Sequence, residues 1–140
     1  KGAVLRSCVR AGDSIVELGA YVGYSSLRLA QHLQACTEAA AGPAGEILQA
    51  TPVIAIEAHP LTAFVARNII CFAGAEGIVD VRIGRAADWL ALPGSLGPVD
   101  MLVFDHRSTS YHEDLVAAEK HLRAGARIVA DNVLHPGAPL

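Results

Sequence analysis

The sequence lacks the features of several protein classes. No run of apolar residues reaches the roughly 18 that a membrane-spanning helix needs, so we expect no membrane segment within these residues. The sequence also has no large excess of charge of either sign, because it contains 11 Lys and Arg and 14 Asp and Glu. The resulting net charge of −3 argues against a protein that binds nucleic acid, and against one that binds a membrane surface through a polybasic patch. With 52% hydrophobic and 18% charged residues, the composition is that of a folded chain.

Cysteine is scarce. Cys8, Cys36 and Cys71 form no C-x-x-C pair, and their number is odd, which argues against a disulfide framework or a zinc knuckle. We expect buried, reduced thiols in a cytoplasmic protein. The chain starts at Lys1 and has no signal-peptide pattern. We interpret residues 1–140 as a single domain that is a fragment of a longer protein, with any membrane attachment outside these residues.

Short apolar runs predict five strands. Near-continuous apolar runs of this length indicate strands buried on both faces, and therefore a parallel sheet. Between them, 3.6-residue periodicity predicts helices over residues 24–33, over 61–72 and after Ser110. Strands that alternate with helices predict right-handed βαβ units and an α/β three-layer sandwich. The expected strands are 14–18, 53–56, 79–83, 101–104 and 126–130.

Each expected helix has a candidate inner face. Gly74 lies just past the second helix, which Pro60 precedes, and Ser110 with Glu113 forms a capping box for the third. Gly125 is the expected stop of that third helix. Residues 36–52 are rich in Ala, Gly and Pro and indicate a surface insertion. The inner faces are Leu27, Ala30 and Leu33; Leu61, Val65, Ile69 and Phe72; and Tyr111, Leu115, Ala118 and Leu122.

A glycine-containing turn follows the first expected strand. Gly19 and Gly23 let the backbone turn tightly and approach a ligand closely. The helix start that follows presents N–H groups, and Ser25 and Ser26 add hydroxyl donors for a carboxylate or phosphate. The spacing is G-x-x-x-G and not the G-x-G-x-x-G of dinucleotide-binding domains, and a purely structural turn explains it equally well.

Acidic residues end three of the other strands. Glu57 follows the second strand, where a carboxylate commonly accepts from ribose hydroxyls. Asp105 follows the fourth strand, and Asp131 with Asn132 follows the fifth. In the usual doubly wound order the fourth and fifth strands adjoin, so these tips converge. Two carboxylates and an amide oxygen suit Mg²⁺. The alternative for the two Asp residues is that they cap helices. The alternative for Glu57 is that it is a solvated carboxylate with no ligand.

Histidine ligand spacing of the H-E-x-x-H kind is absent. His106 is the only one of six histidines expected at a ligand-facing strand tip. We expect His32, His112 and His121 on helix surfaces.

Five segments together resemble the catechol O-methyltransferase family. They occur in the family's order and span nearly the whole chain, and the first and last are the most specific. The resemblance implies a class I S-adenosylmethionine-dependent methyltransferase with a mostly parallel, Rossmann-like sheet, here ending before the last strands. It also implies Mg²⁺ and a catechol-like small-molecule substrate, and it leaves room for a protein partner. The segments are E-L-G-A-Y-V-G-Y-S (17–25), I-E-A-H-P (56–60), F-A-G (72–74), D-H (105–106) and A-D-N-V-L-H-P-G-A-P (130–139).

The resemblance also implies residue roles. The metal would be held by Asp105, Asp131 and Asn132, and Asp105 would also contact the amino group of the cofactor. Catalysis would involve Asp105, His106, Asn132 and the position of Ser108. The cofactor would be bound by Glu17, Gly19, Tyr21 and Ser25 at its methionine part, by Glu57 at the ribose, and by Ala86, Asp105 and His106.

The sequence departs from the family after the fourth strand. The family has D-H-W-K, with Lys as general base, where this chain has Asp105-His106-Arg107-Ser108. Serine is a poor base at neutral pH, and Arg107 replaces a Trp that helps to cover the cofactor. The D-H-R stretch is similar to the transmembrane O-methyltransferase branch.

Three functions therefore remain open. The first is Mg²⁺-dependent methyl transfer from S-adenosylmethionine to a hydroxyl of a catechol-like molecule. The second is a catalytically weak member of the same family that binds cofactor or a protein partner. The third is an unrelated nucleotide-binding α/β domain, against which the absence of G-x-G-x-x-G counts.

Overall fold

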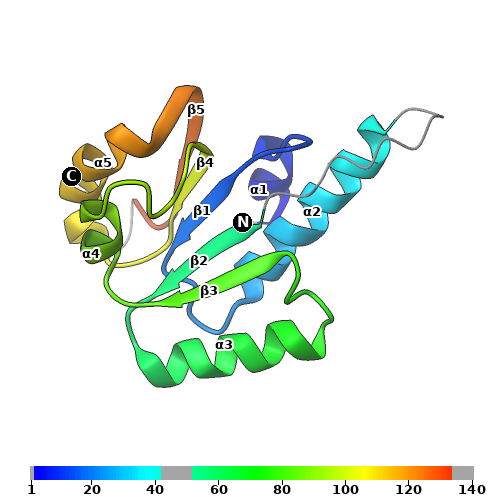
Figure 1. Cartoon of the computed structure of the whole chain (residues 1–140), viewed down its shortest axis with the longest axis horizontal. Coiled ribbons are helices and arrows are strands. Elements are labelled where there is room, and N and C mark those ends of the chain that lie inside the picture. The colour runs from blue at the N-terminus through cyan, green and yellow to red at the C-terminus, as the bar shows by residue number, and fades with distance from the viewer. Residues whose placement is uncertain (1, 42–51, 134–140) are drawn as a thin grey trace.

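A five-stranded parallel sheet forms the centre of the protein (Figure 1). The computed structural model describes residues 2–41 and 52–133. Within them the strand order is β3-β2-β1-β4-β5, and every pairing is parallel. All five expected strands are present, and the parallel sheet is confirmed. The strands are β1 (Ile15–Leu18), β2 (Val53–Glu57), β3 (Val79–Ile83), β4 (Val99–Phe104) and β5 (Leu122–Ala130).

Helices cover both faces of the sheet, so the three-layer architecture is confirmed (Figure 1). The helices α1, α2 and α3 pack on one face, and α4 and α5 pack on the other. Two 3₁₀ turns, Ser108–Ser110 and Glu119–His121, flank α5. The helices are α1 (Gly2–Cys8), α2 (Tyr24–Ala40), α3 (Pro60–Phe72), α4 (Ala86–Ala91) and α5 (Tyr111–Ala118). Among the described residues no helix is both long and apolar enough to cross a bilayer.

Successive side chains of the inner strands pack alternately into the two hydrophobic cores, one on each face of the sheet. Ile15 and Met101 point into the core under α1, α2 and α3, whereas Val16 and Leu102 point into the core under α4 and α5. This is the two-residue period of a strand, and all four are fully buried or nearly so. Burying one such side chain stabilises the fold by about 1.5–3 kcal/mol. The interior therefore fixes β1 and β4 side by side.

The strand β5 differs from its expected burial. The expectation of burial on both faces is wrong here, since Ile128 is 45% exposed and most of the strand is exposed or half-buried. The strand lies at the edge of the sheet, and only β4 pairs with it among the described residues. Its regular pairing runs from Met101 opposite Arg127 to Phe104 opposite Ala130. That pairing is what aligns the carboxyl ends of β4 and β5.

The start of α5 contains no capping box. Ser110 makes no side-chain cap, and its hydroxyl donates instead to the Arg107 carbonyl. The 3₁₀ turn before α5 runs straight into the helix, and the Ser110 N–H donates to the Arg107 carbonyl, so it does not need the Glu113 side chain as its acceptor. Leu115, expected inside, is 36% exposed.

The end of α5 also differs from expectation. The helix ends at Ala118, and Leu122 begins β5, so Gly125 is not a helix stop. Gly125 has φ +81° and lies where the β4–β5 pairing shifts register, a bulge for which glycine is suited. His121, expected at the surface, is buried and bonds through Nε2 to the Leu90 carbonyl at 2.9 Å. It packs there because α5 and α4 lie together on the same face of the sheet.

The helix α3 has its expected period but the opposite orientation. The residues predicted to lie inside are exposed: Leu61 by 72%, Phe72 by 96%, and Val65 and Ile69 to lesser degrees. The inner face is made of Ala63, Ala66 and Ile70. This face packs against Gly23, where a Cβ would lie 3.2 Å from Ile70 Cδ1 and 3.4 Å from Ala66 Cβ. The Gly74 stop is confirmed, with φ +66° and its N–H donating to the Cys71 carbonyl at 2.9 Å.

The helix α2 extends beyond its expected end. Leu27, Ala30 and Leu33 form its inner face as predicted. It continues to Ala40, so residues 36–40 of the predicted 36–52 insertion lie in this helix, and residues 42–51 lie outside the described residues. None of the three cysteines forms a disulfide. The expectation of burial is wrong for Cys71, which is exposed because it lies on the outer side of α3.

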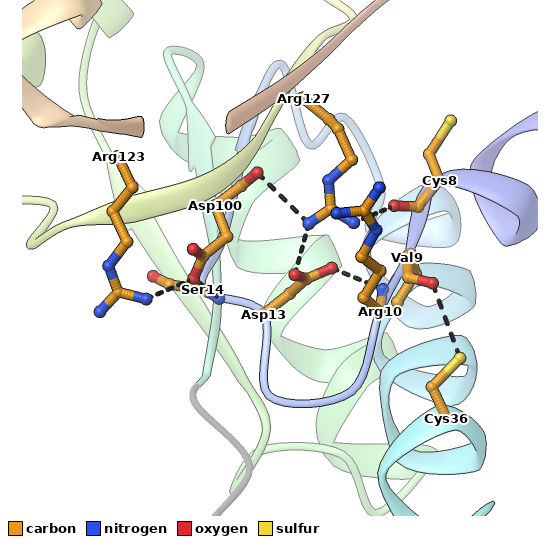
Figure 2. Close-up of polar contacts among 9 residues, drawn as sticks. All are labelled: Cys8, Val9, Arg10, Asp13, Ser14, Cys36, Asp100, Arg123 and Arg127. Atoms are coloured by element: carbon orange, nitrogen blue, oxygen red, sulfur yellow. Dashed lines mark hydrogen bonds and ion pairs between the residues drawn. The ribbon is translucent and has the colours of Figure 1, made fainter. Parts of the chain in front are cut away.

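An arginine at the amino ends of the strands joins β5 to α1 (Figure 2). Arg127 donates from Nη1 to the Cys8 carbonyl at 2.7 Å and from Nη2 to the carboxylate of Asp13 and the carbonyl of Asp100. Asp13 is buried, so the guanidinium supplies the charge partner that a buried carboxylate requires. Segments 114 residues apart are thereby held together.

Asp100 extends the same network. Burial alone would raise the pKa of Asp100, but the Ser14 N–H and the guanidinium groups of Arg123 and Arg127 outweigh it and hold the pKa below its usual value. The Asp100 carboxylate lies 3.0 Å from the Ser14 nitrogen and 2.8 Å from Arg123 Nη1. This network lies at the opposite end of the sheet from the strand tips that carry the predicted site.

The two faces of α3 give a direct test of the packing. Replacing Ala66 by Leu should lower the free energy of unfolding by about 1–3 kcal/mol, because the inner face has no room for the added methylenes. The matched Phe72→Ala change should alter it by less than about 0.5 kcal/mol, since that side chain is exposed. Urea denaturation measures both; a cost of several kcal/mol for Phe72→Ala would show that the outer face is covered.

Candidate functional site

The turn between β1 and α2 packs against the tips of β2 and β4. The N–H groups of Gly19 and Ala20 both donate to the Ile56 carbonyl, at 2.8 and 3.0 Å. Gly19 has φ +99°, and a Cβ built on it would lie 2.6 Å from the Asp105 carbonyl oxygen. No side chain fits at that distance. Glycine here is therefore a requirement of a close backbone approach as well as of a turn.

Glu57 holds the same turn from the other side. Its carboxylate accepts from the Tyr21 N–H at 2.9 Å and from the His59 N–H at 2.8 Å, one bond to each oxygen. Tyr21 has φ +49°, a conformation that non-glycine residues seldom adopt. Each carboxylate oxygen retains a second lone pair, so the group can still accept from a diol. The structure thus places Glu57 beside the glycine turn, where the ribose role was predicted.

Glu17 lies behind the turn. It is fully buried, and the Ser26 hydroxyl donates to its carboxylate. Ser25, on the first turn of α2, is also buried. The two serines lie where the α2 helix starts, with Gly23 (φ +85°) as the residue before it. Direct cofactor contact by Glu17 and Ser25 stays a prediction.

The two predicted metal ligands Asp105 and Asp131 directly follow the adjoining ends of β4 and β5. The Asp105 N–H donates to the Leu18 carbonyl, and the Asp131 N–H donates to the Phe104 carbonyl at 2.9 Å. Both Asp residues therefore directly follow paired strand ends, and both are half-buried. Asn132 has φ +57°, and its N–H donates to Asp131 Oδ1 at 2.9 Å.

The donor set fits a hard divalent cation. Two half-buried carboxylates and an exposed amide on adjoining tips are the oxygen ligands that Mg²⁺ takes, with water or substrate oxygens in the other positions. Within residues 2–41 and 52–133, no group of three or more His, Cys, Asp or Glu gathers as a ligand set. Any metal here would thus depend on the two carboxylates, Asp105 and Asp131, together with Asn132.

His106 is held by residues that the sequence reasoning did not assign to the site. Its Nε2 lies 2.7 Å from Asp114 Oδ2, and Asp114 is only 4% exposed. An ionised carboxylate only accepts, so Nε2 carries the hydrogen. The imidazole also packs on Phe104, 5.8 Å between ring centroids, and on Tyr111 at 5.1 Å. The sequence signal for this contact was an acidic residue, Asp114, three residues after Tyr111 and therefore on the same inward face of the helix.

A shallow, open hollow of about 440 Å³ lies elsewhere. It is lined by Pro52, Arg67, Glu76 and Asp80 among others, beside α3 and β3. It does not include the strand tips that carry the predicted site.

The chain is similar in sequence to known methyltransferases. The family model described as a methyltransferase domain matches residues 16–133. The chain is 36% identical over 147 residues to the transmembrane O-methyltransferase of Homo sapiens, covering 99% of this chain and 46% of that protein. It is 33% identical over 130 residues to the catechol O-methyltransferase of Sus scrofa, covering 89% and 62%.

The chain belongs to the methyltransferase-domain family.

A solved structure supports the same fold. An O-methyltransferase from Bacillus cereus, in complex with SAH, superposes with a TM-score of 0.77 at 29% identity. The match covers 97% of this chain and 57% of that one. The class I, Rossmann-like methyltransferase fold predicted from the sequence is therefore confirmed. This family member spans about half the length of the curated relatives that it matches.

The positions predicted to depart from the catechol O-methyltransferase pattern follow the end of β4, and Ala86 follows the end of β3. Arg107 is exposed, and Ser108 is half-buried as the first residue of the 3₁₀ turn before α5. Ala86, a predicted cofactor contact, is half-buried at the start of α4. That Ser108 stands at the family's Lys position stays a prediction.

The glycine turn gives the site's first test. Gly19→Ala should cost about 1–3 kcal/mol more in unfolding free energy than Gly12→Ala. Both residues have positive φ, but a Cβ on Gly12 meets nothing within 4 Å, whereas one on Gly19 meets the Asp105 backbone. Thermal denaturation of both variants measures the difference; equal costs would contradict the close approach of the β1 turn to the β4 tip.

Proposed function

We propose that the chain transfers a methyl group from S-adenosylmethionine to a hydroxyl of a catechol-like small molecule, with Mg²⁺ held at the tips of β4 and β5. Family membership supports the reaction class, and relatives named as O-methyltransferases support the oxygen acceptor. The solved relative in complex with SAH supports the cofactor. We also propose a cytoplasmic location for this domain.

One observation carries the proposal. The Gly19 turn, proposed to hold the cofactor, lies against the Asp105 backbone, which is proposed to carry the first metal ligand. A methyl donor bound along the turn and a hydroxyl bound at the metal would consequently be neighbours. Transfer between two bound groups requires such proximity and orientation above all.

The chain's own residues would bind and orient the two reactants. Glu57 fixes the Tyr21 backbone and would accept from the ribose hydroxyls. Asp105 would accept from the cofactor's amino group, while Asp105, Asp131 and Asn132 would hold the cation. When bound, Mg²⁺ favours the ionised form of a coordinated hydroxyl, as it does for water. Preorganised charge at the tips then supplies electrostatic stabilisation in the transition state.

The alternative is a family member that binds cofactor or a protein partner with weak catalysis. Ser108 in the position of the family's Lys favours it, because a serine hydroxyl removes no proton at neutral pH. Exposed Arg107, in the position of the family's Trp, favours it as well. If the chain is an active enzyme, ionisation of the acceptor hydroxyl would depend on the metal, with His106 as a candidate helper.

Transfer of labelled methyl to catechol tests the proposal. We expect product with Mg²⁺, none with EDTA, and a loss of at least about tenfold in Mg²⁺-stimulated turnover for Asp131→Asn, because one charged ligand is removed. Glu119→Gln, an exposed carboxylate-to-amide change after α5, is the matched control and should keep full turnover.

Two outcomes would count against this function. Turnover that EDTA leaves unchanged would remove the metal from the mechanism. SAH binding without any methyl transfer to catechol would favour the binding protein instead.

A further inference from the structure

The hydroxyl of Tyr111 lies among three backbone carbonyls. Its oxygen is 3.1 Å from the Phe104 carbonyl, 3.2 Å from that of His106 and 3.0 Å from that of Asp131. A phenol carries one hydrogen, so it donates to one of these oxygens at a time. The ring is held independently, 5.1 Å from the Phe104 ring and 5.1 Å from the His106 ring. The hydroxyl is thus fixed where the two strand tips meet.

These carbonyls belong to the two segments that carry the carboxylates. Phe104 and His106 flank Asp105 on the β4 side, and the third carbonyl is that of Asp131 itself. The regular β4–β5 pairing ends with Phe104 opposite Ala130, and the Asp131 N–H bond to Phe104 is the last contact of that ladder. Beyond it, the Tyr111 hydroxyl also bridges the two segments, because it lies against the carbonyls of both His106 and Asp131. It therefore bears on how far apart Asp105 and Asp131 stand.

A second contact from the same helix strengthens this hold. Asp114, one turn further along α5, binds His106 Nε2 at 2.7 Å and is buried. The first turn of α5 therefore contacts the end of β4 in two ways. Tyr111 binds backbone carbonyls there, and Asp114 binds the His106 ring. Buried groups behind metal ligands commonly set metal affinity in this way.

We propose that Tyr111 is a positioning residue, which acts through the Phe104, His106 and Asp131 backbone to hold the carboxylates of Asp105 and Asp131 side by side for one divalent cation. The inference rests on the proposed function, since it concerns the metal of that same site. It predicts a specific loss: removing the hydroxyl weakens cation binding and leaves cofactor binding at the Gly19 turn and Glu57 in place.

The test measures Mn²⁺ binding by electron paramagnetic resonance and SAH binding by calorimetry on the whole chain. Tyr111→Phe removes the hydroxyl and keeps the ring. We expect Mn²⁺ affinity to fall about 10–100-fold while SAH affinity is retained. Val116→Ala, an exposed change on α5, should bind both as the unaltered protein does, and Asp131→Asn should lose Mn²⁺.

The outcomes separate this inference from the function beneath it. If the unaltered protein binds Mn²⁺, Asp131→Asn loses it, and Tyr111→Phe binds it fully, the positioning role is wrong and the metal site stands. Loss of Mn²⁺ and SAH together in Tyr111→Phe would show a merely structural role and also overturn the inference. An unaltered protein that binds no Mn²⁺ would overturn both.

A measurement on the unaltered sequence covers the case in which Tyr111→Phe fails to fold. With 3-fluorotyrosine incorporated, the ¹⁹F resonance of Tyr111 should shift during Mg²⁺ titration, while that of Tyr24, which is 70% exposed, stays in place. A Tyr111 resonance that ignores Mg²⁺ while the metal binds would overturn the positioning role.

Discussion

The close approach of the β1–α2 turn to the end of β4 is the constraint on which the site depends. Only glycine fits at residue 19, because the Asp105 backbone occupies the space of a side chain. The same turn is fixed to β2 through the Ile56 carbonyl and the Glu57 carboxylate. Three neighbouring strand tips are therefore joined by these contacts. Open parallel sheets bind ligands beyond the carboxyl ends of such strands.

The fourth tip is joined to this group by different means. The strand β5 is only partly buried, so apolar packing contributes less to its position than it does for β1 and β4. Polar contacts act at both ends of its regular pairing with β4. Arg127, where that pairing begins, binds Asp13 and the carbonyl of Cys8, and the Tyr111 hydroxyl lies against the Asp131 carbonyl beyond the carboxyl end. The half-buried Asp131 is thus placed by hydrogen bonds more than by the core.

The sequence was sufficient for the strands and the layer architecture, because apolar runs such as residues 53–56 have no other place than a parallel sheet. It was insufficient where tertiary packing decided between faces. In α3 both the large and the small apolar residues are periodic, and it is Ala63, Ala66 and Ile70 that face inward, with Ala66 and Ile70 packed close to Gly23. The short α1 and α4 carried no period to detect. Asp114 was missed because its partner, His106, lies eight residues away in an irregular turn.

The identity of the ligand at the glycine turn is the central claim, and calorimetry with SAH and with NAD tests it most directly. We expect one SAH to bind per chain, a lower affinity in Glu57→Ala, and no heat from NAD under the same conditions. Binding of NAD without SAH would assign the turn to a different class of nucleotide-binding domain and contradict the account.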